Sequence, residues 1–224
     1  MAKISGPSIA AASGKTGGLI VLCHGYGADG NDLIGLAPHW QRMLPDADFI
    51  SPNAPQRCDA GFGFQWFPIS RLDPAELMRG VESAAPILND FIDEELARRG
   101  LDGSKLALVG FSQGTMMALQ VGLRRAAPPA AIVGYSGALA GGDRLKGELR
   151  GRPPVLMVHG DADDMLPVSR MHDAVRHLGD AGVSVQWHVS PGVGHGIDPE
   201  GLELGGRFLR DAFAGVLAAT ASEN

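Results

Sequence analysis

A serine between two glycines is the residue best placed for nucleophilic chemistry in this sequence. Gly110, Ser112 and Gly114 form a G-x-S-x-G pattern that follows the apolar run LALVGF and precedes a segment of helical period. Between a strand and a helix, this pattern is typical of a nucleophile elbow, in which a sharp turn exposes the serine hydroxyl above a sheet. The N–H of Gln113, at the start of the expected helix, would be free to bind an oxyanion. The pattern predicts acyl transfer through Ser112, with a plain glycine-rich turn as the alternative.

A serine hydroxyl needs a base and an orienting carboxylate, which in this arrangement follow in the order serine, acid, histidine. His195 is the expected base, because among the seven histidines it combines a glycine-rich loop with a position after a late strand. The stretch DADDMLP offers Asp161, Asp163 and Asp164 as the acid, and the spacing does not choose between them. The other histidines are expected to be solvated, to lie in the core or to shape turns: His24, His39, His159, His172, His177 and His188.

A second glycine cluster raises the alternative of nucleotide binding. Gly25, Gly27 and Gly30 spell G-x-G-x-x-G after the apolar run GLIVLCH, a pattern that can hold a dinucleotide pyrophosphate. The acidic residue that such a site requires at the end of the second strand is missing, since that strand ends in SPN. SGKT, at residues 13–16, fails as a phosphate loop because Ile9 stands where the first glycine belongs. We therefore expect no cofactor and no metal.

Length and composition predict a single domain over residues 1–224, or at most two small ones, in which 45% of residues are hydrophobic and 20% charged. The net charge of −6 gives no basic footprint for nucleic acid. No apolar run approaches the ~18 residues of a membrane span, and the N-terminus lacks the apolar segment of a secretory signal. Cys23 and Cys58 are expected to be free thiols. These features predict a cytoplasmic protein without stable membrane insertion.

Six apolar runs of strand length alternate with segments of helical period. The runs are GLIVLCH, ADFISP, KLALVGF, AAIVGYSG, PVLMVHG and VSVQWHV. Helices are expected over residues 32–44, 113–127, 169–178 and 199–219, and over a long segment that Asp73 caps and Gly100 ends. Pro86 predicts a kink in that segment or a division into two helices. The alternation predicts a mostly parallel central sheet with helices on both faces.

The stretch from residue 51 to residue 74, the aromatic loop, departs from this alternation. It is long for a loop and rich in proline, glycine and aromatics. Phe62, Phe64, Trp66 and Phe67 are expected to line an acyl groove beside Ser112, with Met116 as its floor. The alternative is that the aromatics only attach the loop to the core.

These stretches, in order, resemble the phospholipase/carboxylesterase family of α/β-hydrolases, which includes the acyl-protein thioesterases. The resemblance covers essentially the whole chain and rests on LCHGYGADGNDL, SPNAPQ, QWFPI, GFSQGTMMAL, HGDADDMLP and GVGHGI. It implies an α/β-hydrolase fold, and no insertion is long enough for a separate lid domain. It also implies Ser112 as nucleophile, Asp163 as acid through its H-G-x-x-D pattern, and His195 as base. The implied oxyanion hole consists of the backbone N–H groups of Tyr26 and Gln113.

The implied function is that of a serine carboxylic-ester hydrolase acting on a small-molecule ester or acyl thioester. Carboxylesterase, lysophospholipase and acyl-protein thioesterase activities all fit. Acyl-protein thioesterases commonly have leucine at the position of Tyr26, so the acyl pocket is expected to differ from theirs. Lactone hydrolase, peptidase and non-catalytic binding functions stay open as alternatives. The acyl length and the oligomeric state, a homodimer included, are also open.

Overall fold

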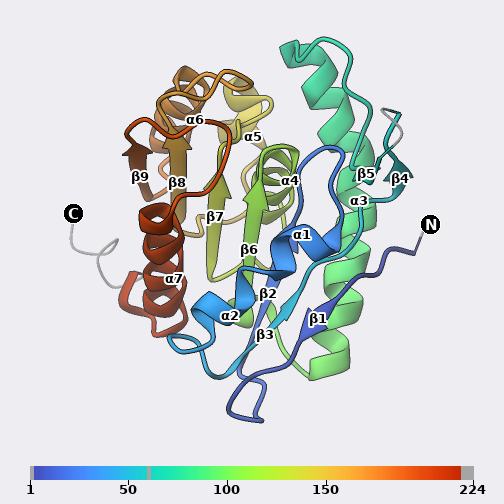
Figure 1. Ribbon diagram of the computed structural model, residues 1–224, viewed down its shortest axis with the longest axis vertical. Helices are drawn as coiled ribbons and strands as arrows, with labels where there is room; N and C mark the ends of the chain where they lie inside the picture. Colours follow the sequence, from blue (N-terminus) through green and yellow to red (C-terminus); the bar gives the residue numbers. More distant parts are fainter. Residues whose placement is uncertain (1–2, 60–61, 218–224) are drawn as a thin grey trace.

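The computed structural model describes residues 3–59 and 62–217 and is built around a seven-stranded sheet (Figure 1). The strands lie in the order β1-β3-β2-β6-β7-β8-β9, and all pair in parallel except β1, which is antiparallel to β3. Their bounds are β1 (Ser8–Ile9), β2 (Gly18–Cys23), β3 (Ala47–Ile50), β6 (Leu106–Phe111), β7 (Ala131–Tyr135), β8 (Val155–Gly160) and β9 (Val185–Ser190). All six expected strands are present, so the predicted mostly parallel α/β sheet is confirmed.

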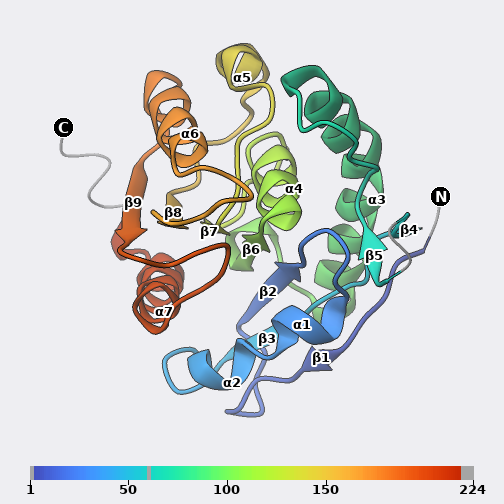
Figure 2. The ribbon, with the colours of Figure 1, turned by 45° about the horizontal axis from the view of Figure 1, so that its top comes forward.

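Helices cover both faces of this sheet. They are α1 (Gly30–Ile34), α2 (Ala37–Trp40), α3 (Pro74–Arg99), α4 (Gln113–Gly122), α5 (Leu145–Glu148), α6 (Ser169–Asp180) and α7 (Pro199–Phe213). Helices α3, α4 and α6 pack into one hydrophobic core, and α1, α2 and α7 into the other (Figure 2). In β2, Leu19 and Val21 face the first core while Ile20 and Leu22 face the second. Burial on both faces explains why the strand sequences are apolar throughout.

Three helix predictions were wrong in their extent. The single helix expected over residues 32–44 is two short helices, because α1 ends at Ile34, just before Gly35, and α2 starts anew with Pro38 in its first turn. Helix α4 ends at Gly122, short of residue 127. Helix α7 ends at Phe213, before Gly215 adopts a left-handed φ of 76°. Residues 218–219 of that expected helix lie outside the described residues.

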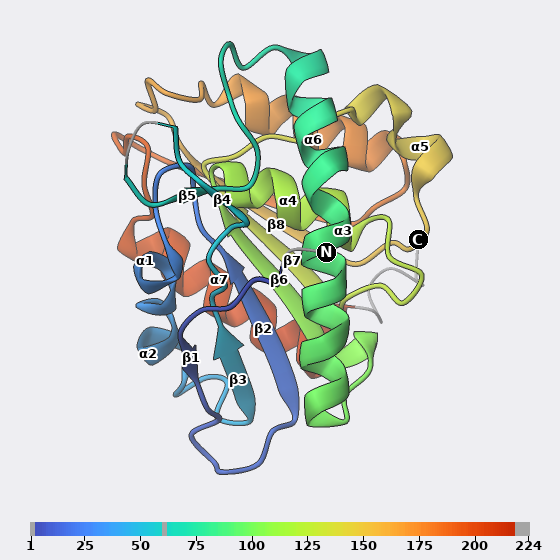
Figure 3. The same cartoon turned by 90° about the vertical axis from the view of Figure 1, so that its right-hand side faces the viewer.

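Helix α3 has the ends that the sequence predicted. The Asp73 side chain accepts a hydrogen bond from the Glu76 N–H, and Gly100 closes the helix in a left-handed conformation. Pro86 lies inside one continuous helix, so the alternative of two helices was wrong. Figure 3 shows α3 standing upright beside α4 on one face of the sheet. A Cβ on Gly80 of α3 would collide with the Phe67 ring, so this helix provides the surface on which the aromatic loop docks.

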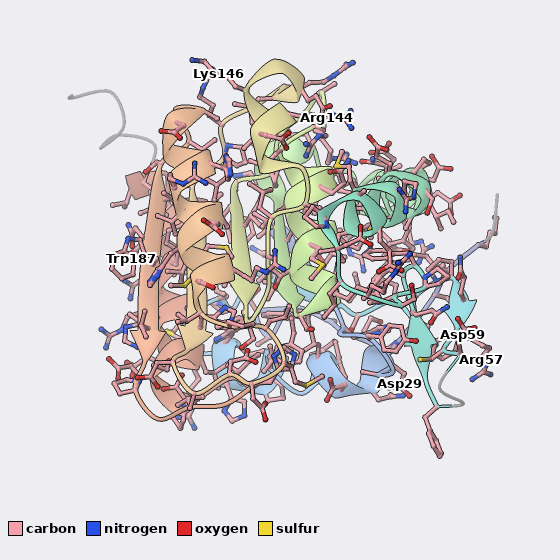
Figure 4. All side chains as sticks on the ribbon, turned by 90° about the horizontal axis from the view of Figure 1, so that it is seen from above. Asp29, Arg57, Asp59, Arg144, Lys146 and Trp187 are labelled. Carbon is pink, nitrogen blue, oxygen red and sulfur yellow. The ribbon has the colours of Figure 1, made fainter. Side chains whose placement is uncertain are left out.

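The carboxyl ends of the parallel strands meet at one edge of the sheet, the upper edge in Figure 1. Figure 4 views this edge, with Trp187 of β9 on one side and Arg57 and Asp59 on the other. Arg57 belongs to a small hairpin, β4 (Gln56–Arg57) and β5 (Phe64–Gln65), that the sequence did not predict. Cys23 and Cys58 are buried free thiols, as predicted. Within residues 3–59 and 62–217, no helix is long and apolar enough to cross a membrane.

Candidate active site

Ser112 occupies a strained turn between β6 and α4. Its φ is 53° and its ψ is −116°, a conformation that side-chain-bearing residues rarely adopt. The Ser112 N–H donates to the carbonyl of Tyr135 at 2.9 Å, which fixes the turn against the neighbouring strand β7. The Ser112 side chain makes no capping hydrogen bond to α4. Its hydroxyl is therefore not engaged by the helix that it precedes.

The two flanking glycines allow the close crossing that this turn needs. A Cβ on Gly110 would collide with the backbone of Gly114, and a Cβ on Gly114 would collide with the carbonyl of Cys23 at the end of β2. Any larger residue would separate the strand, the turn and the helix. The G-x-S-x-G spacing thus has a direct steric basis in this chain.

Asp163 and His195 form a hydrogen-bonded pair beside this turn. Asp163 lies in the loop after β8 and His195 in the loop after β9, and His195 Nδ1 is 2.7 Å from Asp163 Oδ2. The Asp163 side chain is fully buried, and that of His195 is 12% exposed. An ionised carboxylate only accepts, so Nδ1 carries the proton and Nε2 is left as an acceptor.

Asp163 is held in its ionised form although it is buried. Burial raises the pKa of this carboxyl, but the N–H groups of Leu166 and Met165 and the His195 ring outweigh that effect and lower the pKa overall. The N–H groups of Leu166 and Met165 donate to Oδ1 at 2.8 and 3.0 Å. Asp161 and Asp164 are both exposed, and Asp161 accepts from the Gly192 N–H at 2.6 Å. Of the three aspartates in this loop, Asp163 contacts the histidine.

Ser112 and His195 line the same cavity, whose volume is about 140 Å³. Its remaining lining is mostly apolar and consists of Tyr26, Ile69, Leu72, Gln113, Met116, Met165 and Leu166. Met116 was predicted to line the site from the sequence, whereas Ile69, Leu72, Met165 and Leu166 were not. Their proximity to Ser112 arises from two loops that lie far apart in the sequence, and no local pattern reveals it.

Tyr26 and Gln113 both line this cavity, and neither backbone N–H is paired with another group in residues 3–59 and 62–217. Gln113 is the first residue of α4, so its N–H has no intrahelical partner. Within the described chain, the N–H of Tyr26 likewise donates to no other residue. A Cβ on Gly25 would lie 3.4 Å from the Ser112 Cβ, which shows how closely the turn after β2 approaches the serine. The Tyr26 hydroxyl interacts with Cys58, which raises the pKa of Tyr26 to about 12.

The aromatic residues of the long loop do not line this cavity. Phe62 is 82% exposed, and Phe64 lies under the Arg57 guanidinium, 4.4 Å from its ring centroid. Trp66 is fully buried, and its indole N–H donates to the carbonyl of His24 at 3.0 Å. Phe67 is also buried, against α3. The loop is attached to the core by these contacts, and it contributes Ile69 and Leu72, not its aromatic residues, to the cavity wall.

His24 sits under the turn that carries Tyr26. Its Nδ1 lies 2.8 Å from the carbonyl of Gly25, and its Nε2 accepts from the Ala54 N–H at 2.9 Å. Both ring nitrogens are therefore occupied by backbone groups, and burial lowers the pKa of this imidazole. His24 holds two backbone segments together, in the turn-shaping role that the sequence predicted for it.

Known proteins share this architecture. Residues 5–212 match the model of the phospholipase/carboxylesterase family. The chain belongs to this family. It is 29% identical to acyl-protein thioesterase 1 of Gibberella zeae, over 91% of this chain and 94% of that protein. It is 32% identical to acyl-protein thioesterase 1 of Kluyveromyces lactis, over 70% of this chain and 74% of that protein.

The solved structure of a known esterase agrees closely with this one. The crystal structure of esterase PE8 is 42% identical in sequence and superimposes with a TM-score of 0.90, covering 94% of this chain and 99% of that one. The α/β-hydrolase fold class and the family resemblance are thereby confirmed. The protein is accordingly an enzyme of the serine esterase and thioesterase class.

Proposed function

We propose that this protein is a serine carboxylic-ester hydrolase that uses Ser112, Asp163 and His195 through an acyl-enzyme. The observation that carries the proposal is the 2.7 Å contact between His195 and the buried Asp163, at a cavity that Ser112 also lines. The strained φ of Ser112 supports the same role, because strain of this kind concentrates at functional sites.

The proposed reaction has two acyl-transfer steps. His195 Nε2 takes the Ser112 proton as the hydroxyl attacks the ester carbonyl, and Asp163 stabilises the imidazolium that forms. The N–H groups of Tyr26 and Gln113 bind the oxyanion, each contributing about 3 kcal/mol to stabilising the transition state. His195 then protonates the leaving alcohol or thiol. Water activated by the same histidine releases the acyl group.

The size of the cavity favours short acyl groups. A volume of about 140 Å³ corresponds to roughly four or five water molecules in the liquid. The cavity's apolar wall of Ile69, Leu72, Met116 and Leu166 suits an alkyl chain. Met165 also lines the cavity and is 64% exposed, so a longer chain could extend along this residue towards solvent. Thioester cleavage is a second candidate reaction, since the relatives above are named acyl-protein thioesterases.

The proposal extends to partners and location. The expected partner is a small-molecule ester or acyl thioester, without nucleic acid, in keeping with the net charge of −6. A cytoplasmic location is supported by two cysteines that remain free thiols. A homodimer stays a prediction from the sequence.

Fluorophosphonate labelling tests the chemistry directly. The wild-type protein is expected to be labelled and to hydrolyse p-nitrophenyl acetate and butyrate at least tenfold faster than the palmitate ester. Ser112→Ala is expected to lose both the label and the activity while its circular dichroism is unchanged. A folded wild-type protein that takes no label would overturn the proposal. A preference for palmitoyl substrates would overturn only the short-chain assignment.

A further inference from the structure

The loop that carries His195 is held to the rest of the protein by few backbone contacts. A Cβ added to Gly196, the residue after His195, would meet nothing within 4 Å. Among the described residues, the backbone of residues 194–197 makes a single hydrogen bond, in which the Gly196 carbonyl accepts from the Ser136 hydroxyl at 3.0 Å. One serine hydroxyl therefore holds the backbone beside His195, in addition to the side-chain contact with Asp163.

Ser136 is itself firmly fixed. It follows the last residue of β7, is fully buried, and donates its N–H to the carbonyl of Val158 in β8 at 2.9 Å. Its φ is 44°, in the left-handed region that residues with a side chain rarely adopt. Such conformations persist where the surrounding structure enforces them, and they cluster at functional sites. Within the described chain, three residues other than glycine have a φ of this kind, and the other two, Leu72 and Ser112, line the catalytic cavity.

The end of β7 connects the nucleophile to the base. Tyr135, the residue before Ser136, accepts the Ser112 N–H at 2.9 Å through its carbonyl. Ser136 holds the backbone beside His195 through its hydroxyl, which must be the donor because the Gly196 carbonyl can only accept. Two successive residues thus fix the turn of the nucleophile and the loop of the base to the same strand.

The remaining contacts of His195 involve its ring. Nδ1 lies 2.7 Å from Asp163 Oδ2, and the ring packs against Phe111 with 5.0 Å between the centroids. A ring bonded at one nitrogen can still pivot about that bond, which moves Nε2. Proton transfer needs Nε2 within about 2.6–3.2 Å of the Ser112 hydroxyl. Fixing the backbone next to His195 restricts the pivoting of the ring.

We propose that Ser136 is a positioning residue for the catalytic base, whose hydroxyl keeps His195 within proton-transfer reach of Ser112. This inference rests on the proposed function. Ser136 does not line the catalytic cavity, so it acts through Gly196 and His195 and not on substrate. Loss of its hydroxyl is expected to slow the chemical steps more than it weakens substrate binding.

Ser136→Ala and Ser136→Gly test this role. Both remove the hydroxyl, but glycine adopts the left-handed φ without strain and alanine does not. In both variants we expect kcat on p-nitrophenyl butyrate to fall by about five- to fiftyfold. KM should stay within about twofold, because His195 acts in both acyl-transfer steps. The fluorophosphonate labelling rate should fall with kcat. The glycine variant should melt at a higher temperature than the alanine variant, which separates the loss of kcat from the loss of stability.

Ser51→Ala is the matched control. Ser51 is fully buried after β3, and its hydroxyl donates to the carbonyl of Leu22 at 3.1 Å. The control removes the same kind of buried hydrogen bond at the same edge of the sheet, away from the loop of His195. Its melting temperature should fall, while its kcat and labelling rate should stay within about threefold of wild type.

The outcomes separate this inference from the proposed function. Folded Ser136 variants with the wild-type kcat and labelling rate would overturn the positioning role. A raised KM at unchanged kcat would also overturn it, as would an equal loss of kcat in Ser51→Ala. If Ser136→Ala does not fold, Ser136→Gly decides the question by the same criteria. Failure of the wild-type protein to label would instead overturn the proposed function itself.

Discussion

At the scale of single residues, Asp163 differs from its neighbours in what its carboxylate accepts. It receives N–H groups from Leu166, Met165 and the His195 imidazole, whereas Asp161 accepts from the backbone of Gly192 at the surface. Sequence order alone left three aspartates open, and the family pattern selected Asp163. The structure brings that residue against His195 because β8 and β9 are adjacent parallel strands whose loops leave the same edge.

Asp163→Asn is expected to lower kcat by about a thousandfold to ten-thousandfold, because an amide can stabilise the wrong tautomer of His195 and cannot stabilise its cation. Asp161→Asn is the matched control. It keeps an oxygen that can accept from the Gly192 N–H, so its kcat is expected to stay within about threefold of wild type. Steady-state kinetics on p-nitrophenyl butyrate measure both. The reverse result, with Asp161→Asn inactive, would make Asp161 the acid.

At the scale of elements, the aromatic loop braces the two segments that carry the backbone N–H groups of Tyr26 and Gln113, the proposed oxyanion hole. Trp66 donates its indole N–H to the carbonyl of His24, and its backbone N–H to the Gln113 side chain at 2.9 Å. The same Gln113 amide donates to the carbonyl of Phe67 at 2.7 Å. The sequence predicted an ordered aromatic loop near Ser112. It could not predict which way each ring points, because that depends on partners more than forty positions away along the chain.

Trp66→Phe and Phe62→Ala test whether the aromatic loop supports the site through the hydrogen bonds of Trp66 and not through a contact of Phe62 with substrate. Loss of the Trp66 indole N–H leaves the buried carbonyl of His24 unpaired, at a cost of about 1–3 kcal/mol, which corresponds to a melting temperature lower by about 3–10 °C. Phe62 is 82% exposed, and its removal is expected to change neither the melting temperature nor KM. A large rise in KM for Phe62→Ala would instead support its original assignment to the acyl groove.

Glu76 fixes the segment that contributes Leu72 to the cavity. Its carboxylate accepts from the N–H groups of Ser70, Arg71 and Leu72 and from the Ser70 hydroxyl, while Leu72 is held at a φ of 55°. The Ser70 hydroxyl and the backbone N–H groups of Arg71 and Ser70 are the main causes that lower the pKa of Glu76 to about 2. An isolated glutamate titrates near 4.5. The stabilising effect of the Glu76 carboxylate is therefore complete above about pH 4.5 and is lost as the pH falls through about 2.

Glu76→Gln is expected to raise KM by about three- to tenfold, because the amide group of glutamine cannot accept all four donors and the Leu72 wall loosens. Its melting temperature should lie below that of wild type at pH 7. This difference in melting temperature should shrink as the pH is lowered from 4.5 towards 2. The wild-type carboxyl group becomes neutral in that range, as the glutamine amide is at every pH. Thermal unfolding across this range measures the change. A difference that stays constant to pH 2 would show that the Glu76 charge is not responsible.

At the scale of the whole molecule, the strands were easier to predict than the site. A strand buried on both faces must be apolar along its length, so β2, β6, β7 and β8 are recognisable from the sequence. Helix ends were misjudged where a turn replaced an expected continuation, as at Gly35 and Gly215. The wall of the cavity could not be predicted, because it forms only when the loops that carry Ile69 and Leu72 and Met165 and Leu166 come together beside Ser112.

The core between α7 and the sheet depends on close approach at a helical glycine. In α7, a Cβ on Gly205 would overlap the hydroxyl of Tyr135, a residue of β7 whose carbonyl also accepts the Ser112 N–H. In α6, a Cβ on Gly179 would meet nothing within 4 Å. Alanine has the higher helix propensity at both positions, so only the packing differs between them.

Gly205→Ala and Gly179→Ala are therefore expected to shift stability in opposite directions. Overpacking against Tyr135 costs about 1–3 kcal/mol and should lower the melting temperature by about 3–10 °C. Gly179→Ala should raise it by about 1–3 °C, because only the conformational freedom of glycine is removed. Differential scanning calorimetry of the two variants measures the contrast. Equal shifts of the same sign would mean that helix propensity, and not the close approach of α7 to the sheet, governs both positions.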